Sequence, residues 1–171
     1  SAKKDVSKSL DNKSDKVKVI NKKKQNNIDL NIRINNCFVE CTKDIKLSVS
    51  KTWVEFMNFL ITRDRSLISL LADTSILAAS SSYILIQSKI NSTKDLINNS
   101  IMDLEKYYED FVGNKVRFAA LSDNLWKKEM ENYRINIKNG IKYSYMSEPE
   151  IENSVSDNVI TSLNGDDIEE I

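Results

Sequence analysis

Turn-forming residues are scarce in this chain of 171 residues, which contains three glycines and one proline. An all-β fold needs a tight turn between most of its strands, and glycine and proline supply many of those turns. The sequence therefore predicts a helix-rich fold. Hydrophobic residues at 40% and charged residues at 29% are typical of soluble globular proteins, and the length leaves room for one domain with tails.

Charge is unevenly distributed along the chain, although its formal net charge is zero. Residues 1–52 carry 13 Lys and Arg against 6 Asp and Glu, a net of +7, and residues 53–147 carry 12 against 11. Residues 148–171 carry 8 acidic residues and no basic ones. Strongly charged ends are typical of solvated segments. The sequence predicts three parts: a basic, mostly disordered linker over 1–47, an α+β domain over 48–140, and an acidic tail over 141–171.

Hydrophobic periodicity predicts that the domain is a small three-stranded sheet covered by about four helices, in the order ααββαβα. Trp53, Phe56 and Leu60 share one face of the first helix, for which Ser48 and Ser50 are the candidate N-caps. The other expected elements are a short helix at Leu67–Leu71, strands at 75–79, 83–87 and 115–121, a long helix from Ser92 to Gly113, and a helix from Ser122 to Gly140.

Apolar and polar residues alternate strictly from Ile28 to Ile34, which is the periodicity of a strand. This stretch is interpreted either as an edge strand or as an apolar patch within the linker. The two cysteines that follow, Cys37 and Cys41, are too few for a structural zinc site in a chain without histidine. No signal peptide or membrane span is present in the sequence, so we expect reduced thiols in a cytoplasmic protein.

Catalytic residue patterns are scarce. The absence of histidine removes the commonest general base and the usual partner of a nucleophilic Ser or Cys. The three glycines form no phosphate-binding loop. The carboxylates between Glu105 and Asp110 are interpreted as a solvated helix face. The sequence therefore predicts a protein that is not an enzyme and that uses no metal or cofactor.

A nucleic-acid-binding role is the alternative that the basic segment raises. Lys22, Lys23 and Lys24 are the densest cationic cluster, and such clusters contact phosphates without sequence preference. The segment has no interleaved aromatic residues that would stack on bases, which favours a plain linker over a nucleic-acid contact.

The acidic segment carries the sharpest candidate for a binding site. Pro149 is a candidate first residue of a short helix over 149–163, in which apolar residues recur every four positions. An apolar stripe on an acidic segment is typical of a helix that binds in a partner's groove, and it is equally typical of a helix that packs on its own domain. The candidate partner-binding residues are Ile151, Val155, Val159, Ile160, Leu163, Ile168 and Ile171.

Aromatic residues divide into two groups. Trp53 and Trp126 lie on apolar helical stripes and are predicted to pack in the core. Tyr107, Tyr143 and Tyr145 lie off these stripes, where surface tyrosines commonly anchor partners.

Several motifs in this order resemble one family. The first helix carries W-x-x-F-x-x-x-L (Trp53–Leu60), and the second carries L-x-x-L-L (Leu67–Leu71). The long helix ends in F-V-G (Phe111–Gly113), and the chain closes with V-I-x-x-L-x-G-D-D-I-x-E (Val159–Glu170). The chain resembles the C-terminal region of the gamma/tau subunit of bacterial DNA polymerase III, the clamp-loader component, in its alphaproteobacterial form.

The resemblance implies a KH-like α/β fold and a scaffold role in DNA replication. In that family this region tethers the polymerase α subunit, with the extreme C-terminal tail taking part, which corresponds here to Glu148–Ile171. An adjoining region of the family contacts the replicative helicase. Other clamp-loader subunits are bound through an amino-terminal AAA+ ATPase part that is not in this sequence. The competing expectation is a KH-like nucleic-acid-binding module, although the G-x-x-G loop of KH domains is missing.

Overall fold

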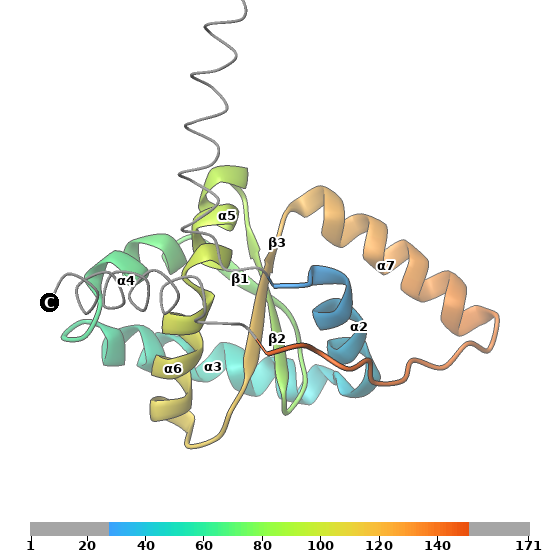
Figure 1. Cartoon of the computed structure of the whole chain (residues 1–171), viewed down its shortest axis with the longest axis horizontal. Helices are drawn as coiled ribbons and strands as arrows, with labels where there is room; N and C mark the ends of the chain where they lie inside the picture. Colours follow the sequence, from blue (N-terminus) through green and yellow to red (C-terminus); the bar gives the residue numbers. More distant parts are fainter. Residues whose placement is uncertain (1–27, 151–171) are drawn as a thin grey trace, which may run out of the picture. The chain divides into compact units, whose positions relative to one another are not determined.

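The computed structural model describes residues 28–150 of the chain and shows an α+β fold, as the sequence predicts. Within these residues it contains six helices and one mixed three-stranded sheet (Figure 1). The elements in chain order are α2 (Leu30–Glu40), α3 (Lys43–Leu60), α4 (Arg65–Leu71), β1 (Thr74–Ala79), β2 (Tyr83–Ser88), α5 (Asn91–Asn99), α6 (Ile101–Val112), β3 (Arg117–Leu121) and α7 (Asp123–Lys138).

The sheet has the strand order β1-β2-β3. Strands β1 and β2 form an antiparallel hairpin in which Ile76 pairs with Ile86, and an irregularity follows at Leu77. Strand β3 runs parallel to β2, with Ala119 opposite Leu85. Helices α5 and α6 connect the two strands and return the chain to the end of the sheet at which β2 begins. The sheet is therefore mixed, and β2 is its central strand.

Helices cover both faces of this sheet. Tyr83 and Leu85 of β2 belong to a buried cluster with α2, against which residues of α7 pack. The alternate residues Ile84 and Ile86 are also fully buried. They point to the opposite face, because side chains of a strand alternate between its two faces. Aromatic contacts from α3 through Tyr108 of α6 to β3 lie on that second face. The central strand is consequently buried on both sides.

Polar caps begin several helices and a glycine ends one of them. Ser122 accepts a hydrogen bond from the backbone N–H of Leu125 at the start of α7, as the sequence predicts. Gly113 has a φ of 86° and ends α6 in the left-handed conformation that was expected there. The predicted strands and the short helix at Leu67–Leu71 are also present.

Residues 28–34 are neither an edge strand nor an apolar patch of linker, and both interpretations are wrong, because helix α2 begins at Leu30. Asp29 caps the helix by accepting a hydrogen bond from the N–H of Ile32. Beyond the alternating stretch the apolar residues follow helical spacing, and Ile34, Cys37 and Phe38 are buried on the sheet. Residues 28–47 therefore belong to the same compact unit as the sheet, and the domain boundary predicted at residue 48 is wrong.

Two predicted helices have different bounds in the structure. Helix α3 begins at Lys43 after the cap Thr42, so Ser48 and Ser50 lie inside it. The single long helix predicted from Ser92 is two helices that meet at Ser100. Together with α2, this split gives six helices within residues 28–150, where about four were expected.

Residues 141–150 belong to the same compact unit as the helices and the sheet. They have no helical or strand structure, and Pro149 does not begin a helix within the described residues. The predicted boundary at 141 between domain and tail is therefore wrong, while residues 151–163 of the predicted helix lie outside the described part.

Candidate functional site

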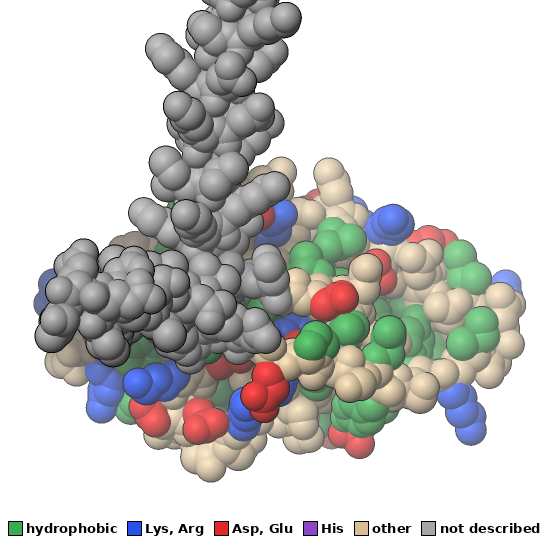
Figure 2. All heavy atoms as spheres, in the orientation of Figure 1, with side chains coloured by type: hydrophobic (Ala, Val, Ile, Leu, Met, Phe, Trp, Pro, Cys, Tyr) green, Lys and Arg blue, Asp and Glu red, His purple; other side chains and the backbone are tan. Residues whose placement is uncertain are grey.

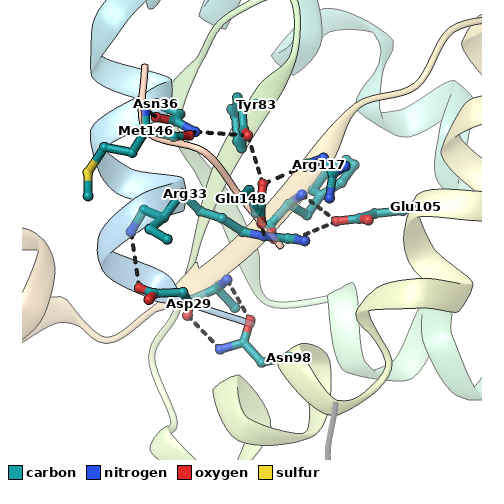
Figure 3. Close-up of polar contacts among 12 residues, drawn as sticks. Asp29, Arg33, Asn36, Tyr83, Asn98, Glu105, Arg117, Met146 and Glu148 are labelled. Atoms are coloured by element: carbon teal, nitrogen blue, oxygen red, sulfur yellow. Dashed lines mark hydrogen bonds and ion pairs between the residues drawn. The ribbon is translucent and has the colours of Figure 1, made fainter. Parts of the chain in front are cut away.

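A buried arginine of α2 is the centre of the polar structure in this domain. Arg33 has no exposed surface. Its guanidinium pairs through Nε with Glu148 and through Nη1 with Glu105 at 2.6 Å (Figure 3). The same Nη1 donates a hydrogen bond to the carbonyl of Phe118 in β3 at 2.5 Å. Arg33 thereby joins α2, α6, β3 and the segment 141–150, which are far apart in the sequence.

Glu148 is held by three side chains, of which Arg33 of α2 is the first. The Tyr83 hydroxyl donates to its Oε2 at 2.7 Å, and Nε of Arg117 lies 3.5 Å from the same oxygen. Its side chain is only 6% exposed. A carboxylate in such a position needs cations and donors to offset the loss of water, and Arg33, Arg117 and Tyr83 supply them.

The segment before Glu148 is held along α2 by side-chain amides. Asn36 accepts from the N–H of Met146 at 2.8 Å and donates to its carbonyl at 2.9 Å. Asn35 donates to the carbonyl of Ser144 at 2.8 Å. A single amide thus makes the pair of hydrogen bonds that a neighbouring strand would make. Hydrogen bonds and an ion pair with α2 consequently fix segment 144–148 to the domain.

Tyr145 adds a contact at the surface. Its hydroxyl donates to Oε2 of Glu40 at 2.7 Å, and this hydrogen bond to a carboxylate raises the pKa of Tyr145 to about 12. Tyr145 remains 49% exposed.

Side chains also close the outer edge of β3. Glu105 accepts from the N–H of Phe118 at 2.8 Å, and Arg33 donates to the Phe118 carbonyl. Asn98 accepts from the N–H of Ala120 and donates to its carbonyl, both at 2.9 Å. Two residues of an edge strand therefore have their outward-facing backbone groups satisfied by side chains. An edge capped in this way offers no free groups there for pairing with another strand.

One donor of the cluster has no partner. Nη2 of Arg33 is buried and makes no hydrogen bond, and it is the only such side-chain atom in the described part of the chain. The other nitrogens of this guanidinium bind two carboxylates and a carbonyl, so the cluster is a structural ion network rather than an open cation site.

Glu105 is the residue of this network whose protonation we expect to change the stability of the protein with pH. Burial raises the pKa of Glu105, and the nearby Arg33 opposes that rise. A raised pKa means that the folded state holds its proton more tightly than the unfolded state. The contribution of Glu105 to the free energy of unfolding is then fully present below the pKa of the unfolded state, about 4.5. It is lost as pH rises through the higher pKa of the folded state.

The variant Glu105→Gln tests this sign. Its amide oxygen can still accept from Arg33 and Phe118 but carries no charge. We expect the wild type to lose stability relative to the variant as pH rises from 4 to 7, measured by urea unfolding at several pH values. The opposite trend would mean that attraction by Arg33 outweighs burial. Glu129→Gln on α7 is the matched control, because it removes one carboxylate that lies outside this network.

Helix α7 is attached through an aromatic cluster on the other side of α2. The ring of Phe38 lies 4.9 Å from Tyr133, 5.6 Å from Tyr143 and 6.1 Å from Trp126, measured between centroids. Tyr133 and Tyr143 are stacked at 5.5 Å. None of the residues of α7 is fully buried. Offset aromatic pairs of this kind add to the burial of their surface, so Phe38 is the main point of attachment for the helix.

An apolar groove of about 300 Å³ lies beside this cluster. Its walls come from α2, the start of α3, β1 and α7. It is lined by Phe38, Cys41, Thr42, Lys43, Lys46, Leu77, Ala78, Trp126, Met130 and Tyr133. Further apolar side chains are exposed near the end of α7 and along segment 141–150, and Figure 2 shows hydrophobic side chains gathered on that side of the molecule. They are Ile135, Ile137, Ile141, Tyr145 and Met146.

The two cysteines are unpaired and differ in environment. Cys37 is fully buried, whereas Cys41 is half-buried and lines the groove. The neighbouring Cys37 thiol lowers the pKa of Cys41, whereas the interaction with Cys41 together with burial raises the pKa of Cys37. Cys41 is therefore the more reactive of the two thiols.

The binding residues predicted from the sequence lie outside the described part of the chain. These are Lys22, Lys23 and Lys24 at one end and Ile151, Val155, Val159, Ile160, Leu163, Ile168 and Ile171 at the other.

The tyrosines predicted to be surface anchors differ in how exposed they are. Tyr107 is half-buried, Tyr143 packs on Phe38 and only Tyr145 is exposed. Trp53 and Trp126 both pack against aromatic rings, although neither is fully buried.

The polar network was not predicted from the sequence. Glu105 was assigned to a solvated helix face, and that assignment is wrong because its side chain is 11% exposed and paired with Arg33. A signal existed in α2, where Arg33 and Asn36 interrupt a helical apolar stripe and therefore point toward the core. Within residues 28–150, acidic and cysteine side chains form no group that could hold a metal ion.

Helices within residues 28–150 are too short or too polar to cross a membrane. Comparison of the chain with protein-family models, with curated proteins and with solved structures finds no match.

Proposed function

We propose that this chain is a non-catalytic scaffold module that binds the α subunit of bacterial DNA polymerase III through its acidic C-terminal segment. It would act in the cytoplasm, as part of the gamma/tau subunit of the clamp loader. The proposal rests on the resemblance of the motifs between Trp53 and Glu170 to the C-terminal region of that subunit.

The observation that supports it most is the fixation of Glu148. Arg33 and Tyr83 hold this residue to the folded domain, three positions before the first apolar residue of the acidic segment. A binding segment that begins at a fixed point loses less chain entropy on binding than one that begins in a free linker. The domain would thus position the segment, and the segment would bind the partner.

Titration of the α subunit with the full chain tests the proposal. The double variant Val155→Asp/Val159→Asp places charges on the predicted apolar stripe, and we expect its Kd to rise at least about 100-fold, since buried apolar anchors dominate such interfaces. The matched control Ser154→Asp/Asn158→Asp adds the same charge beside the stripe. It should bind nearly as the wild type does.

A salt series with single-stranded DNA tests the competing role. Tight DNA binding that weakens steeply with salt, without binding to the α subunit, would replace the scaffold proposal with a nucleic-acid-binding function. Replacing Lys22, Lys23 and Lys24 with Gln would then remove the DNA binding. The chain has glycines only at 113, 140 and 165, so it lacks the G-x-x-G loop with which KH domains clamp a nucleic-acid backbone.

A further inference from the structure

The groove beside Phe38 has the composition of a protein-binding site. One wall is Trp126, Met130 and Tyr133, which follow one another at i, i+4 and i+7 along α7. All three are only half-buried in the folded domain. Trp and Tyr are frequent anchors of interfaces, and a Met side chain adapts its shape to a partner. The wall therefore presents an apolar stripe that the fold itself does not cover completely.

The opposite wall is basic. Lys43 and Lys46 lie in the first turn of α3, and no carboxylate lines the groove. Neither lysine takes part in an ion pair within residues 28–150. An occupant that places acidic side chains on this wall would gain both attraction and a preferred orientation.

Apolar and basic walls together select one kind of occupant. We propose that this groove binds an acidic amphipathic helix of another protein. Apolar residues of that helix at i, i+3 or i+4, and i+7 would pack against the stripe of α7 and on Phe38 and Leu77. Its acidic residues would face Lys43 and Lys46. This is a second docking surface, separate from the C-terminal segment that carries the proposed polymerase contact.

Cys41 provides a native reporter for occupancy of the groove. It lines the groove, whereas Cys37 is fully buried, so a thiol reagent should modify Cys41 first. The probe is a synthetic N-acetylated 16-residue helix with Leu at a four-residue spacing on one face and Glu on its flanks. We expect a saturating amount of this peptide to slow modification of Cys41 by N-ethylmaleimide at least fivefold in the full chain, followed by mass spectrometry. The protection should weaken as salt is added.

Charge and shape are tested separately by variants. Lys43→Glu/Lys46→Glu should weaken binding of the acidic peptide about tenfold, because it reverses both charges on the basic wall. The control Lys51→Glu/Lys128→Glu makes the same change on α3 and α7 at exposed positions that do not line the groove. Met130→Asp should abolish protection, and circular dichroism checks that each variant remains folded.

Three outcomes would overturn the proposal. Absence of protection by the acidic peptide excludes this occupant, and equal protection by a peptide with Lys in place of Glu shows that the basic wall does not select it. The third is a Cys41 that is already protected in the full chain and becomes reactive in Val155→Asp/Val159→Asp, which would assign the groove to the chain's own C-terminal segment. The first two outcomes do not depend on binding to the polymerase α subunit, so they leave the proposed function untouched. The third bears on both proposals, and titration of the α subunit then shows whether the C-terminal segment also binds that partner.

Discussion

Replacing Arg33 with Met should lower the free energy of unfolding by about 3–5 kcal/mol, because it leaves two buried carboxylates without their shared cation. Glu105 and Glu148 are 11% and 6% exposed, so water cannot replace the guanidinium at either. The loss is a large fraction of the roughly 5–15 kcal/mol that stabilises a typical domain. Urea unfolding monitored by circular dichroism measures it, with the m-value showing whether the native state remains compact.

A variant in which all three residues of the network are neutral distinguishes the effect of charge on stability from the effect of packing. In the triple variant Arg33→Met/Glu105→Gln/Glu148→Gln no buried carboxylate is left without its cation, and we expect it to recover a large part of the lost stability. A triple variant as unstable as Arg33→Met would instead attribute the loss to the packing and backbone hydrogen bond of Arg33. Arg134→Met is the control for charge removal. Arg134 is 71% exposed in its pair with Glu131, and its loss should cost less than about 1 kcal/mol.

The same network connects the fold to the proposed function. Arg33 binds Glu148, which lies 115 positions later in the chain. If this contact positions the acidic segment, Arg33→Met should also weaken binding of the polymerase α subunit under conditions where the variant is still folded. Stability and binding would then change together through one residue that touches no partner.

The parts of the fold that were predictable depend on local signals. A polar cap at Ser122 and a left-handed glycine at Gly113 act within a single helical turn, and the sequence displays them directly. The apolar strand Tyr83–Ser88 directly follows the serines at 80–82 and was equally predictable. Each of these signals operates over a few residues and needs no knowledge of distant neighbours.

Helix α2 was missed because two local patterns compete. Strict alternation from Ile28 to Ile34 indicates a strand, but the longer series Leu30, Ile34, Cys37, Phe38 and Cys41 has the spacing of a helix. The longer pattern wins, since it places an apolar face over twelve residues on the sheet. Counting the series past the alternating stretch would have included helix α2 in the domain.

Segment 141–150 could not be assigned from local sequence. Tyr143 and Glu148 look like surface residues of a polar stretch, and what buries them is Phe38 and Arg33, more than a hundred positions earlier. A buried arginine is also invisible to composition, because charged residues in a sequence are counted as exposed by default. Long-range polar contacts of this kind become visible only in three dimensions.

Replacing Asn98 with Ala should lower the free energy of unfolding by about 2–4 kcal/mol, because each buried backbone group left unsatisfied costs about 1–3 kcal/mol. Asn98 binds both the N–H and the carbonyl of Ala120, a residue with no exposed surface. The new gap at the edge of β3 also frees a strand edge for intermolecular pairing, so the variant should aggregate more readily on warming.

Amide hydrogen exchange resolves this effect by residue. The N–H of Ala120 should exchange much faster in Asn98→Ala, while the N–H of Ala119 faces β2, since backbone groups alternate along a strand, and should keep most of its protection. Asn114→Ala at an exposed loop position is the matched control and should change stability by less than about 0.5 kcal/mol. Uniform acceleration of both amides would indicate global destabilisation, and the side-chain cap of β3 would then not be a local device. Faster exchange at Ala120 alone would show that the Asn98 side chain makes the hydrogen bonds that an adjacent strand would otherwise make with Ala120.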